Sequence, residues 1–208
     1  MGRTASARTQ TRRTTKPTSV GLFVAAAAII GAFVVQPASS SAPSSTAARR
    51  GDQRGAAGVT EADGALPDGV TVFDDRHPGV ANLDPDLLRV LRDAATDAAA
   101  DDVTFSVNSG WRSPDYQEQL RREAVAEYGS DEEAARWVAT AVTSAHVSGD
   151  AVDIGSSDAA AWLSERGAGY GLCQIYANES WHYELRPEAI DRGCPRMYAD
   201  PTHDPRMQ

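Results

Sequence analysis

The chain has 208 residues, enough for one or two domains, and its charge is divided unevenly along the sequence. Residues 1–56 carry eight basic side chains and one acidic one, whereas the remainder carries twelve basic and twenty-eight acidic ones, so the net charges are +7 and −16. The acidic part argues against a nucleic-acid partner and against binding to a membrane surface, because both depend on clusters of Lys and Arg. A hydrophobic share of 41% argues against a chain that is disordered throughout.

Residues 1–36 have the pattern of a signal peptide or an N-terminal membrane anchor. A polar, basic stretch precedes the uncharged run VGLFVAAAAIIGAFVV at 20–35, which is short for a bilayer span of about 20 residues. The positive flank predicts that the rest of the chain is translocated. We therefore expect an extracytoplasmic protein, secreted or tethered to the outer face of the bacterial cytoplasmic membrane, which contacts the membrane only through this segment.

Residues 37–66 are rich in Ser, Ala, Gly and Pro and contain few large apolar side chains. Such a segment buries too little surface to offset the entropy lost on ordering, so it is expected to be a disordered linker. Residues 67–208 remain, and they suffice for one domain with its own core.

The pattern of this domain predicts helices and strands in alternation. Asp84-Pro85 and Ser113-Pro114 each combine an N-cap residue with proline at the first helical position, Gly129 is a helix terminator, and SDEE at 130–133 is a capping box. The expected elements are helix 85–100, strand 103–108, helix 114–128, helix 131–142, strand 151–154, a short helix after Ser157, and a hairpin of strands 172–176 and 181–185. Helices around a small antiparallel sheet make a single α+β domain.

Residues with the chemistry of a metal site lie in three short segments: SGWRS at 109–113, SAHVSGDAVD at 144–153 and ESWHY at 179–183. Catalytic zinc takes three nitrogen or oxygen ligands from the protein, and His146, Asp153 and His182 would supply that set. On an unbroken strand His146 and Asp153 would point to opposite faces, so a bend at Gly149 is needed to bring them together.

Glu179 and His182 are three residues apart, yet the stretch 181–185 alternates like a strand, with His182 and Glu184 on one face. Glu179 is therefore expected in the hairpin turn, leaning over the metal, where a carboxylate can take a proton from a zinc-bound water. Arg112 lies between a strand and a helix, from where its guanidinium can reach a carboxylate or a developing oxyanion.

The order SGWR, SAHVSGDAVDIG and ESWHYEL closely resembles the VanY-like zinc D-alanyl-D-alanine carboxypeptidases, which have the hedgehog/D,D-peptidase fold. The resemblance covers roughly residues 103–185. It implies Zn²⁺ as cofactor and peptidoglycan stem peptides as substrates, with removal of the C-terminal D-Ala. It also implies these roles: His146, Asp153 and His182 as zinc ligands, Glu179 as general base, Arg112 at the scissile carbonyl, and Ser144 and Gln117 near the substrate.

Other interpretations of the same residues stay open. The same chemistry also allows an L,D-carboxypeptidase or a peptidoglycan endopeptidase, because loops determine the substrate, and a zinc-stabilised cell-wall binding module without turnover is a further alternative. Gln117 has a plainer interpretation as a helix-surface residue, and Trp137 and Trp162 are most simply core residues. We expect a monomer.

Cys173 and Cys194 are the only cysteines. In an exported chain such a pair is more often bonded than free, so a disulfide is expected that closes a loop of about 20 residues.

Overall fold

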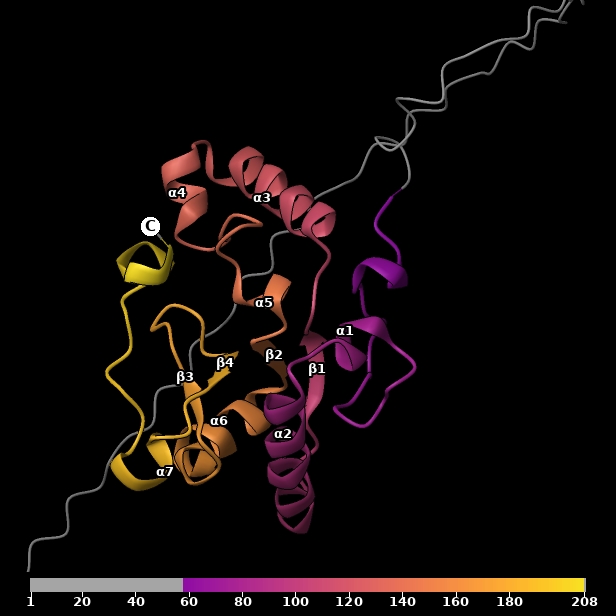
Figure 1. Ribbon diagram of the computed structural model, residues 1–208, viewed down its shortest axis with the longest axis vertical. Coiled ribbons are helices and arrows are strands. Elements are labelled where there is room, and N and C mark those ends of the chain that lie inside the picture. The colour runs from indigo at the N-terminus through magenta and orange to yellow at the C-terminus, as the bar shows by residue number, and fades with distance from the viewer. Residues whose placement is uncertain (1–57, 208) are drawn as a thin grey trace, which may run out of the picture. The chain divides into compact units, whose positions relative to one another are not determined.

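A four-stranded antiparallel sheet organises the part of the chain that the computed structural model describes, residues 58–207 (Figure 1). The strands are β1 (Ser106–Ser109), β2 (Ala151–Gly155), β3 (Leu172–Gln174) and β4 (His182–Leu185), in the order β1-β2-β4-β3. All neighbouring strands run antiparallel. The α+β class and the β3–β4 hairpin expected from the sequence are confirmed.

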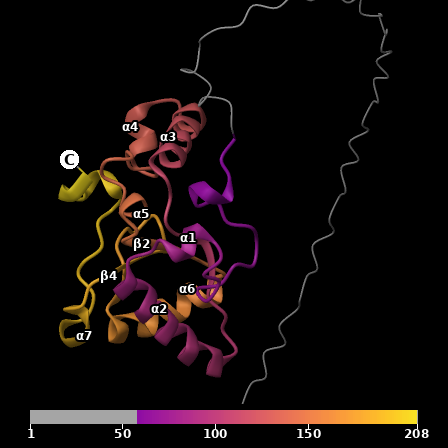
Figure 2. The ribbon, with the colours of Figure 1, turned by 45° about the vertical axis from the view of Figure 1, so that its right-hand side comes forward.

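Helices lie on two sides of this sheet (Figures 1 and 2), with α2 and α6 on one side and α3 and α4 on the other. The α-helices are α1 (Pro78–Ala81), α2 (Pro85–Ala98), α3 (Pro114–Tyr128), α4 (Asp131–Ala135), α5 (Ala145–Ser148), α6 (Ser157–Arg166) and α7 (Ala189–Arg192). Short 3₁₀ turns are η1 (Glu61–Asp63), η2 (Ala99–Asp101), η3 (Gly167–Tyr170), η4 (Pro201–His203) and η5 (Pro205–Met207).

The two long helices begin where their capping residues predict. The Asp84 side chain accepts hydrogen bonds from the backbone N–H groups of the first turn of α2, and the Ser113 hydroxyl accepts one from the first turn of α3. Gly129 ends α3 with φ +83°, a conformation that glycine adopts at little cost. At α6 the capping residue is Ser156 rather than the expected Ser157.

The pairing register sorts the side chains of β2 and β4 onto two faces. Val152 lies opposite Tyr183, while Asp153 lies opposite His182 and Ala151 opposite Glu184. Residues opposite each other on antiparallel strands point to the same face. One face therefore carries apolar side chains into the core, and the other carries His182, Asp153 and Glu184.

The main core fills the space between the apolar face of the sheet and helices α2 and α6. Phe105 and Trp162 meet edge to face at its end, with ring centroids 5.6 Å apart. Its buried members from the strands and from these helices are Leu87, Val90, Leu91, Ala94, Ala95, Ala98, Val107, Val152, Ile154, Ala159, Trp162, Leu163, Leu172 and Tyr183. The interpretation of Trp162 as a core residue is confirmed.

Several elements are shorter than the sequence predicts. In the hairpin, β3 ends at Gln174 rather than Tyr176, and β4 begins at His182 rather than Trp181. Residues 103–105 were expected in the first strand, but β2 reaches only to the pair Ser106–Gly155, so they have no partner strand. Helix 131–142 was wrong beyond Ala135. Beyond Ala135, side chains of α3 take up the backbone carbonyls of the predicted helix. Gln117 donates to Ala139 O, and Arg121 donates to Val138 O.

As a consequence, Trp137 and Val142 do not enter the core. Trp137 is 38% exposed and Val142 is 94% exposed. The expectation that Trp137 is a core residue was therefore wrong.

Residues 58–66, expected in the linker, pack against the domain. Ser113 donates from its backbone nitrogen to Asp63 O at 2.8 Å and from its hydroxyl to Asp63 Oδ1 at 3.1 Å, and Leu66 packs on the main core. The expected signal or anchor at 1–36 and the linker up to residue 57 lie outside the described residues. Within residues 58–207, no helix has the length and apolar character of a membrane span.

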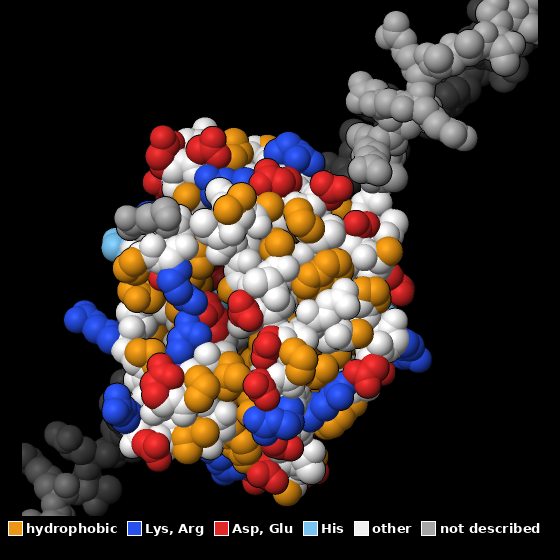
Figure 3. Space-filling model, in the orientation of Figure 1, with side chains coloured by type: hydrophobic (Ala, Val, Ile, Leu, Met, Phe, Trp, Pro, Cys, Tyr) orange, Lys and Arg blue, Asp and Glu red, His pale blue; other side chains and the backbone are white. Residues whose placement is uncertain are grey.

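The C-terminal segment, residues 194–207, runs back along β3 toward the polar face of the sheet (Figure 1). The predicted disulfide between Cys173 and Cys194 is confirmed, and it joins the start of this segment to β3. The segment next forms a parallel bridge between Tyr176 and Tyr198. On the face shown in Figure 3, acidic and basic side chains of the described residues are interspersed with hydrophobic ones.

Candidate metal centre

The sheet register brings two of the predicted ligands together. Asp153 on β2 and His182 on β4 form a cross-strand pair, and their side chains share the polar face of the sheet. Asp153 Oδ1 lies 3.2 Å from His182 Nδ1. Both side chains are buried.

His146 reaches the same carboxylate from the short helix α5. Gly149 ends α5 with φ +85° and turns the chain into β2, which is the bend that the odd spacing of His146 and Asp153 requires. An added Cβ at Gly149 would lie 2.6 Å from Asn82 O, so the turn also needs a residue without a side chain. His146 Nε2 lies 3.4 Å from Asp153 Oδ1.

The three side chains have the donors and the spacing of a metal site. One ligand atom from each of His146, Asp153 and His182 lies within 4.8 Å of the other two, and all three residues are buried. A tetrahedral zinc ion with ligand atoms about 2.0–2.1 Å away has donor–donor edges of about 3.3–3.4 Å. The observed separations of 3.2 and 3.4 Å fit such an ion.

The far nitrogen of each imidazole has a partner that directs the other nitrogen toward the cluster. His146 Nδ1 lies 2.8 Å from Gly110 O and donates to it, which leaves Nε2 as the free acceptor. His182 Nε2 lies 3.3 Å from Glu184 Oε1, which leaves Nδ1 facing Asp153. Carbonyl or carboxylate partners of this kind are the usual supports of metal-binding histidines.

The electrostatics of the cluster favour a cation. Burial opposes the charged form of His182, but hydrogen bonds with Asp153 and Glu184 outweigh it and raise the pKa of His182 to about 9. Burial also opposes ionisation of Asp153, yet the charges and hydrogen bonds of the two histidines, with Arg112, hold the pKa of Asp153 well below its usual range. A place that stabilises a proton so strongly also favours a metal cation.

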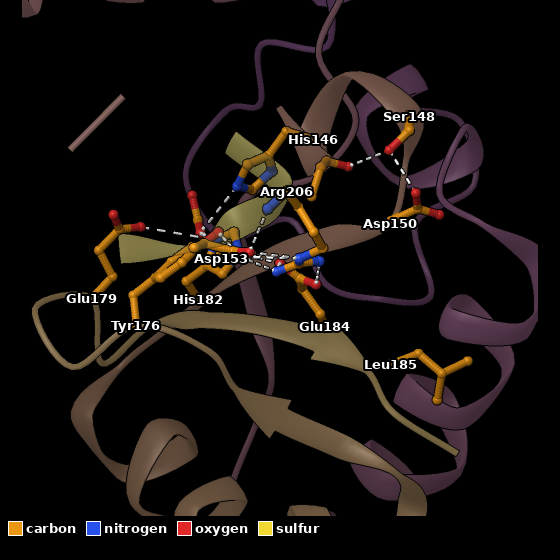
Figure 4. Close-up of polar contacts among 12 residues, drawn as sticks. His146, Ser148, Asp150, Asp153, Tyr176, Glu179, His182, Glu184, Leu185 and Arg206 are labelled. Atoms are coloured by element: carbon orange, nitrogen blue, oxygen red, sulfur yellow. Dashed lines mark hydrogen bonds and ion pairs between the residues drawn. The ribbon is translucent and has the colours of Figure 1, made fainter. Parts of the chain in front are cut away.

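Glu179 lies in the β3–β4 turn, as expected, and leans over the cluster (Figure 4). Its side chain is buried, with Oε2 3.8 Å from His182 Nδ1. Among the described residues, no group forms a hydrogen bond with the buried Oε1 of Glu179. Burial raises the pKa of Glu179 to about 7. A buried, unpartnered carboxylate oxygen beside a metal-type cluster is suited to a proton acceptor.

Arg112 contacts the cluster from the other side of Asp153. Arg112 Nη2 donates to Asp153 Oδ2 at 2.9 Å, so one carboxylate oxygen faces the histidines and the other the guanidinium. Arg112 Nε donates to Ser109 Oγ at 2.7 Å, and Nη1 donates to Gln117 Oε1 at 3.1 Å. Gln117 is buried, so its interpretation as a helix-surface residue was wrong. Its amide orients Arg112 and holds Ala139.

A cavity of about 400 Å³ opens onto the cluster. Its lining includes His146, Asp153, His182, Glu179, Arg112 and Ser144. Residues of α3 and of the 137–139 stretch also line it, among them Tyr128 and Trp137, whose rings stack with centroids 5.9 Å apart. Ser144 precedes α5, and its side chain does not cap that helix.

Sequence reasoning missed Glu184 and Arg206 as residues of the site. Glu184 is 1% exposed and contacts His182. Its position two residues after His182 on a strand, and so on the same face, was the available signal. Arg206 contacts Glu184 across 22 residues of sequence, and no local pattern indicates that contact.

These features define an α+β protein with a buried His–Asp–His cluster that could hold a metal ion, on the wall of an open cavity, with a carboxylate that lies beside the cluster. The model of the VanY D-alanyl-D-alanine carboxypeptidase family matches residues 81–188, which include the cluster and Glu179. The chain belongs to this family, and the resemblance drawn from the sequence motifs is confirmed.

Known proteins with similarity to the chain include a D-alanyl-D-alanine carboxypeptidase of Enterococcus faecalis (strain ATCC 700802 / V583), which is 33% identical over 118 residues. That match spans 45% of this chain and 44% of the relative. Two similar solved structures are the vancomycin resistance D,D-pentapeptidase VanY in complex with Zn(II) (30% identity, TM-score 0.47, 50% of this chain and 72% of that one) and VanYB in complex with D-alanine-D-alanine (29% identity, TM-score 0.49, 53% and 74%).

Proposed function

We propose that the chain is a zinc-dependent carboxypeptidase that removes the C-terminal D-Ala from peptidoglycan stem peptides. The observation that carries the proposal is the buried, unpartnered oxygen of Glu179 beside the His–Asp–His cluster, in a cavity open to a peptide. Membership of the VanY family supports the substrate class. A non-catalytic binding module has no use for such a carboxylate.

Zinc is the metal that the donor set favours, held by His146 Nε2, Asp153 Oδ1 and His182 Nδ1. When bound, it would supply a Lewis acid that polarises the scissile carbonyl and acidifies a water.

Glu179 is proposed to move the proton. Its Oε1 takes a proton from water as the water oxygen bonds to the carbonyl carbon of the substrate. The C–N bond then breaks, and Glu179 returns the proton to the departing amine, which leaves as free D-Ala. Burial raises the pKa of Glu179 to about 7, so the carboxylate can both accept and return a proton near neutral pH.

Arg112 and Ser144 are proposed to contact the substrate, since both line the cavity. The Arg112 guanidinium is fixed by Ser109, Gln117 and Asp153, so a remaining N–H can be aimed at the carbonyl oxygen without further ordering. Gln117, expected near the substrate, acts in this proposal by orienting Arg112.

The proposed location is extracytoplasmic, in keeping with substrates in the cell wall and with the disulfide Cys173–Cys194, because disulfides persist in oxidising compartments.

Release of D-Ala from a synthetic stem pentapeptide that ends in D-Ala-D-Ala tests the proposal, with the zinc-loaded full chain and with chelator added. The expected result is release that the chelator abolishes and zinc restores. Release only from a tetrapeptide would indicate an L,D-carboxypeptidase, and release only from cross-linked peptides an endopeptidase. Absence of all three with zinc bound would refute the proposed activity.

A further inference from the structure

A series of polar contacts connects the C-terminal segment to the metal-binding histidine (Figure 4). Arg206 Nη1 donates to Glu184 Oε2 at 2.7 Å, and Arg206 Nη2 donates to Glu184 Oε1 at 3.2 Å. Glu184 Oε1 in turn lies 3.3 Å from His182 Nε2. The oxygen that contacts the imidazole is therefore also one of the two that the guanidinium holds.

The burial of Glu184 makes a counter-charge necessary. A carboxylate that is 1% exposed needs a cation and hydrogen bonds to remain ionised. Arg186 donates to Oε2 of Glu184, whereas Arg206 spans both oxygens in a forked pair. A forked guanidinium fixes the orientation of a carboxylate as well as its charge.

Arg206 is itself held in place. Its Nε donates to Asp204 Oδ1 at 3.1 Å and to Oδ2 at 3.0 Å. Asp204 is buried and also accepts a hydrogen bond at 3.0 Å from the hydroxyl of Tyr176, whose ring centroid lies 5.1 Å from that of His182. The segment thus reaches the imidazole by two routes, through Glu184 at its edge and through the Tyr176 ring at its side.

The segment that carries Arg206 is anchored along its length and lies beyond residue 188, where the family match ends. The disulfide Cys173–Cys194 fixes its start. Tyr198 then donates to Ile175 O at 2.9 Å, and Asp200 pairs with Arg136 at 3.2 Å. These anchors determine where Arg206 lies. Of the residues in the three sequence motifs, Glu184 is the one that Arg206 contacts.

We propose that Arg206 is a positioning residue of the metal centre, which holds Glu184 and through it the imidazole of His182. The proposal rests on the proposed metal site and is independent of which peptide is cleaved. The 194–207 segment, which lies outside the three sequence motifs, then contributes a residue that orients the metal centre. Loss of the contact lets Glu184 reorient and leaves the His182 ring free to rotate, so metal affinity falls.

The test measures zinc affinity of the full chain by chelator competition for the wild type, Arg206→Gln, Arg206→Lys and Arg196→Gln. Arg196 lies in the same segment and is exposed, so it is the matched control. Arg206→Gln is expected to weaken zinc binding by about 10- to 100-fold, the usual effect of losing an outer partner of a metal ligand. Arg206→Lys keeps the charge but loses the fork, so it should fall between, and Arg196→Gln should match the wild type.

A double-mutant cycle separates positioning from a general loss of stability. In a Glu184→Gln background, Arg206→Gln is expected to cause a much smaller loss of zinc affinity than in the wild type, because only the contact through Asp204 and Tyr176 remains. Circular dichroism of the metal-free proteins checks folding. If Arg206→Gln does not fold, Arg206→Lys and the double variant, which removes both members of the Glu184–Arg206 pair, carry the comparison.

Wild-type zinc affinity in Arg206→Gln, or an equal loss in the presence and absence of Glu184, would overturn the inference. A wild type that binds no zinc would overturn the metal site and this inference with it. A wild type that binds zinc but cleaves no peptide, together with weakened binding in Arg206→Gln, would refute only the proposed activity.

Discussion

Replacement of Glu179 by glutamine tests the proposed base with the least change in shape. Among the described residues, Oε1 of Glu179 makes no hydrogen bond that an amide would lose. A general base contributes about 10²- to 10⁴-fold to a rate, or about 2.7–5.4 kcal/mol of activation free energy. Glu179→Gln should therefore lower kcat by that factor. Its zinc affinity should stay close to that of the wild type, because Glu179 lies outside the ligand set.

The assay is D-Ala release from the stem pentapeptide, with zinc affinity measured in parallel. Glu165→Gln on α6 is a matched control, since Glu165 is an exposed glutamate that does not line the cavity. It should hydrolyse the peptide at the wild-type rate. Wild-type hydrolysis by zinc-bound Glu179→Gln would refute the role given to this carboxylate.

Other expected outcomes concern the cavity, the protons and the disulfide. Trp137→Ala removes an aromatic side chain from the cavity wall, so KM should rise with kcat unchanged; a fall in kcat alone would contradict a role in binding. Because the pKa of His182 is raised to about 9, the metal-free cluster holds a proton at pH 7 that zinc must displace. Zinc affinity should thus rise with pH toward 9, by about tenfold per pH unit. Calorimetry in buffers of different ionisation enthalpy should show about one proton released on zinc binding. An affinity that is independent of pH between about 6 and 8 would contradict this. Reduction of Cys173–Cys194 should lower the free energy of unfolding by about 3 kcal/mol in a denaturant titration, and an unchanged midpoint would show that the bridge does not stabilise the fold.

Local signals predicted the parts of the fold that depend on neighbours in sequence. Asp84-Pro85 and Ser113-Pro114 mark the starts of α2 and α3, because a capping side chain and a proline act within one turn. Gly149 marks the bend in the same way. His146 and Asp153 are an odd number of residues apart, so they reach one site only if the chain turns between them. The residues of the cluster could therefore be predicted from the sequence.

Contacts between distant segments explain what was missed. The stretch after Ala135 has a helical pattern, but Gln117 and Arg121 take up its carbonyls, and this leaves Trp137 on the cavity wall. The role of Arg206 depends on a chain path set by the disulfide and by the Tyr176–Tyr198 bridge. Side-chain pairings across tens of residues leave no period or motif in one sequence.

The contact between Glu184 and Arg206 bears on the order in which the parts of the site form. Arg206 follows Glu184 by 22 residues, so a growing chain presents every proposed zinc ligand before it presents the arginine. The bridge to Cys173 also closes only after Cys194 has entered an oxidising compartment. In the proposed extracytoplasmic location, the contact of Arg206 with Glu184 would therefore be the last part of the metal centre to form.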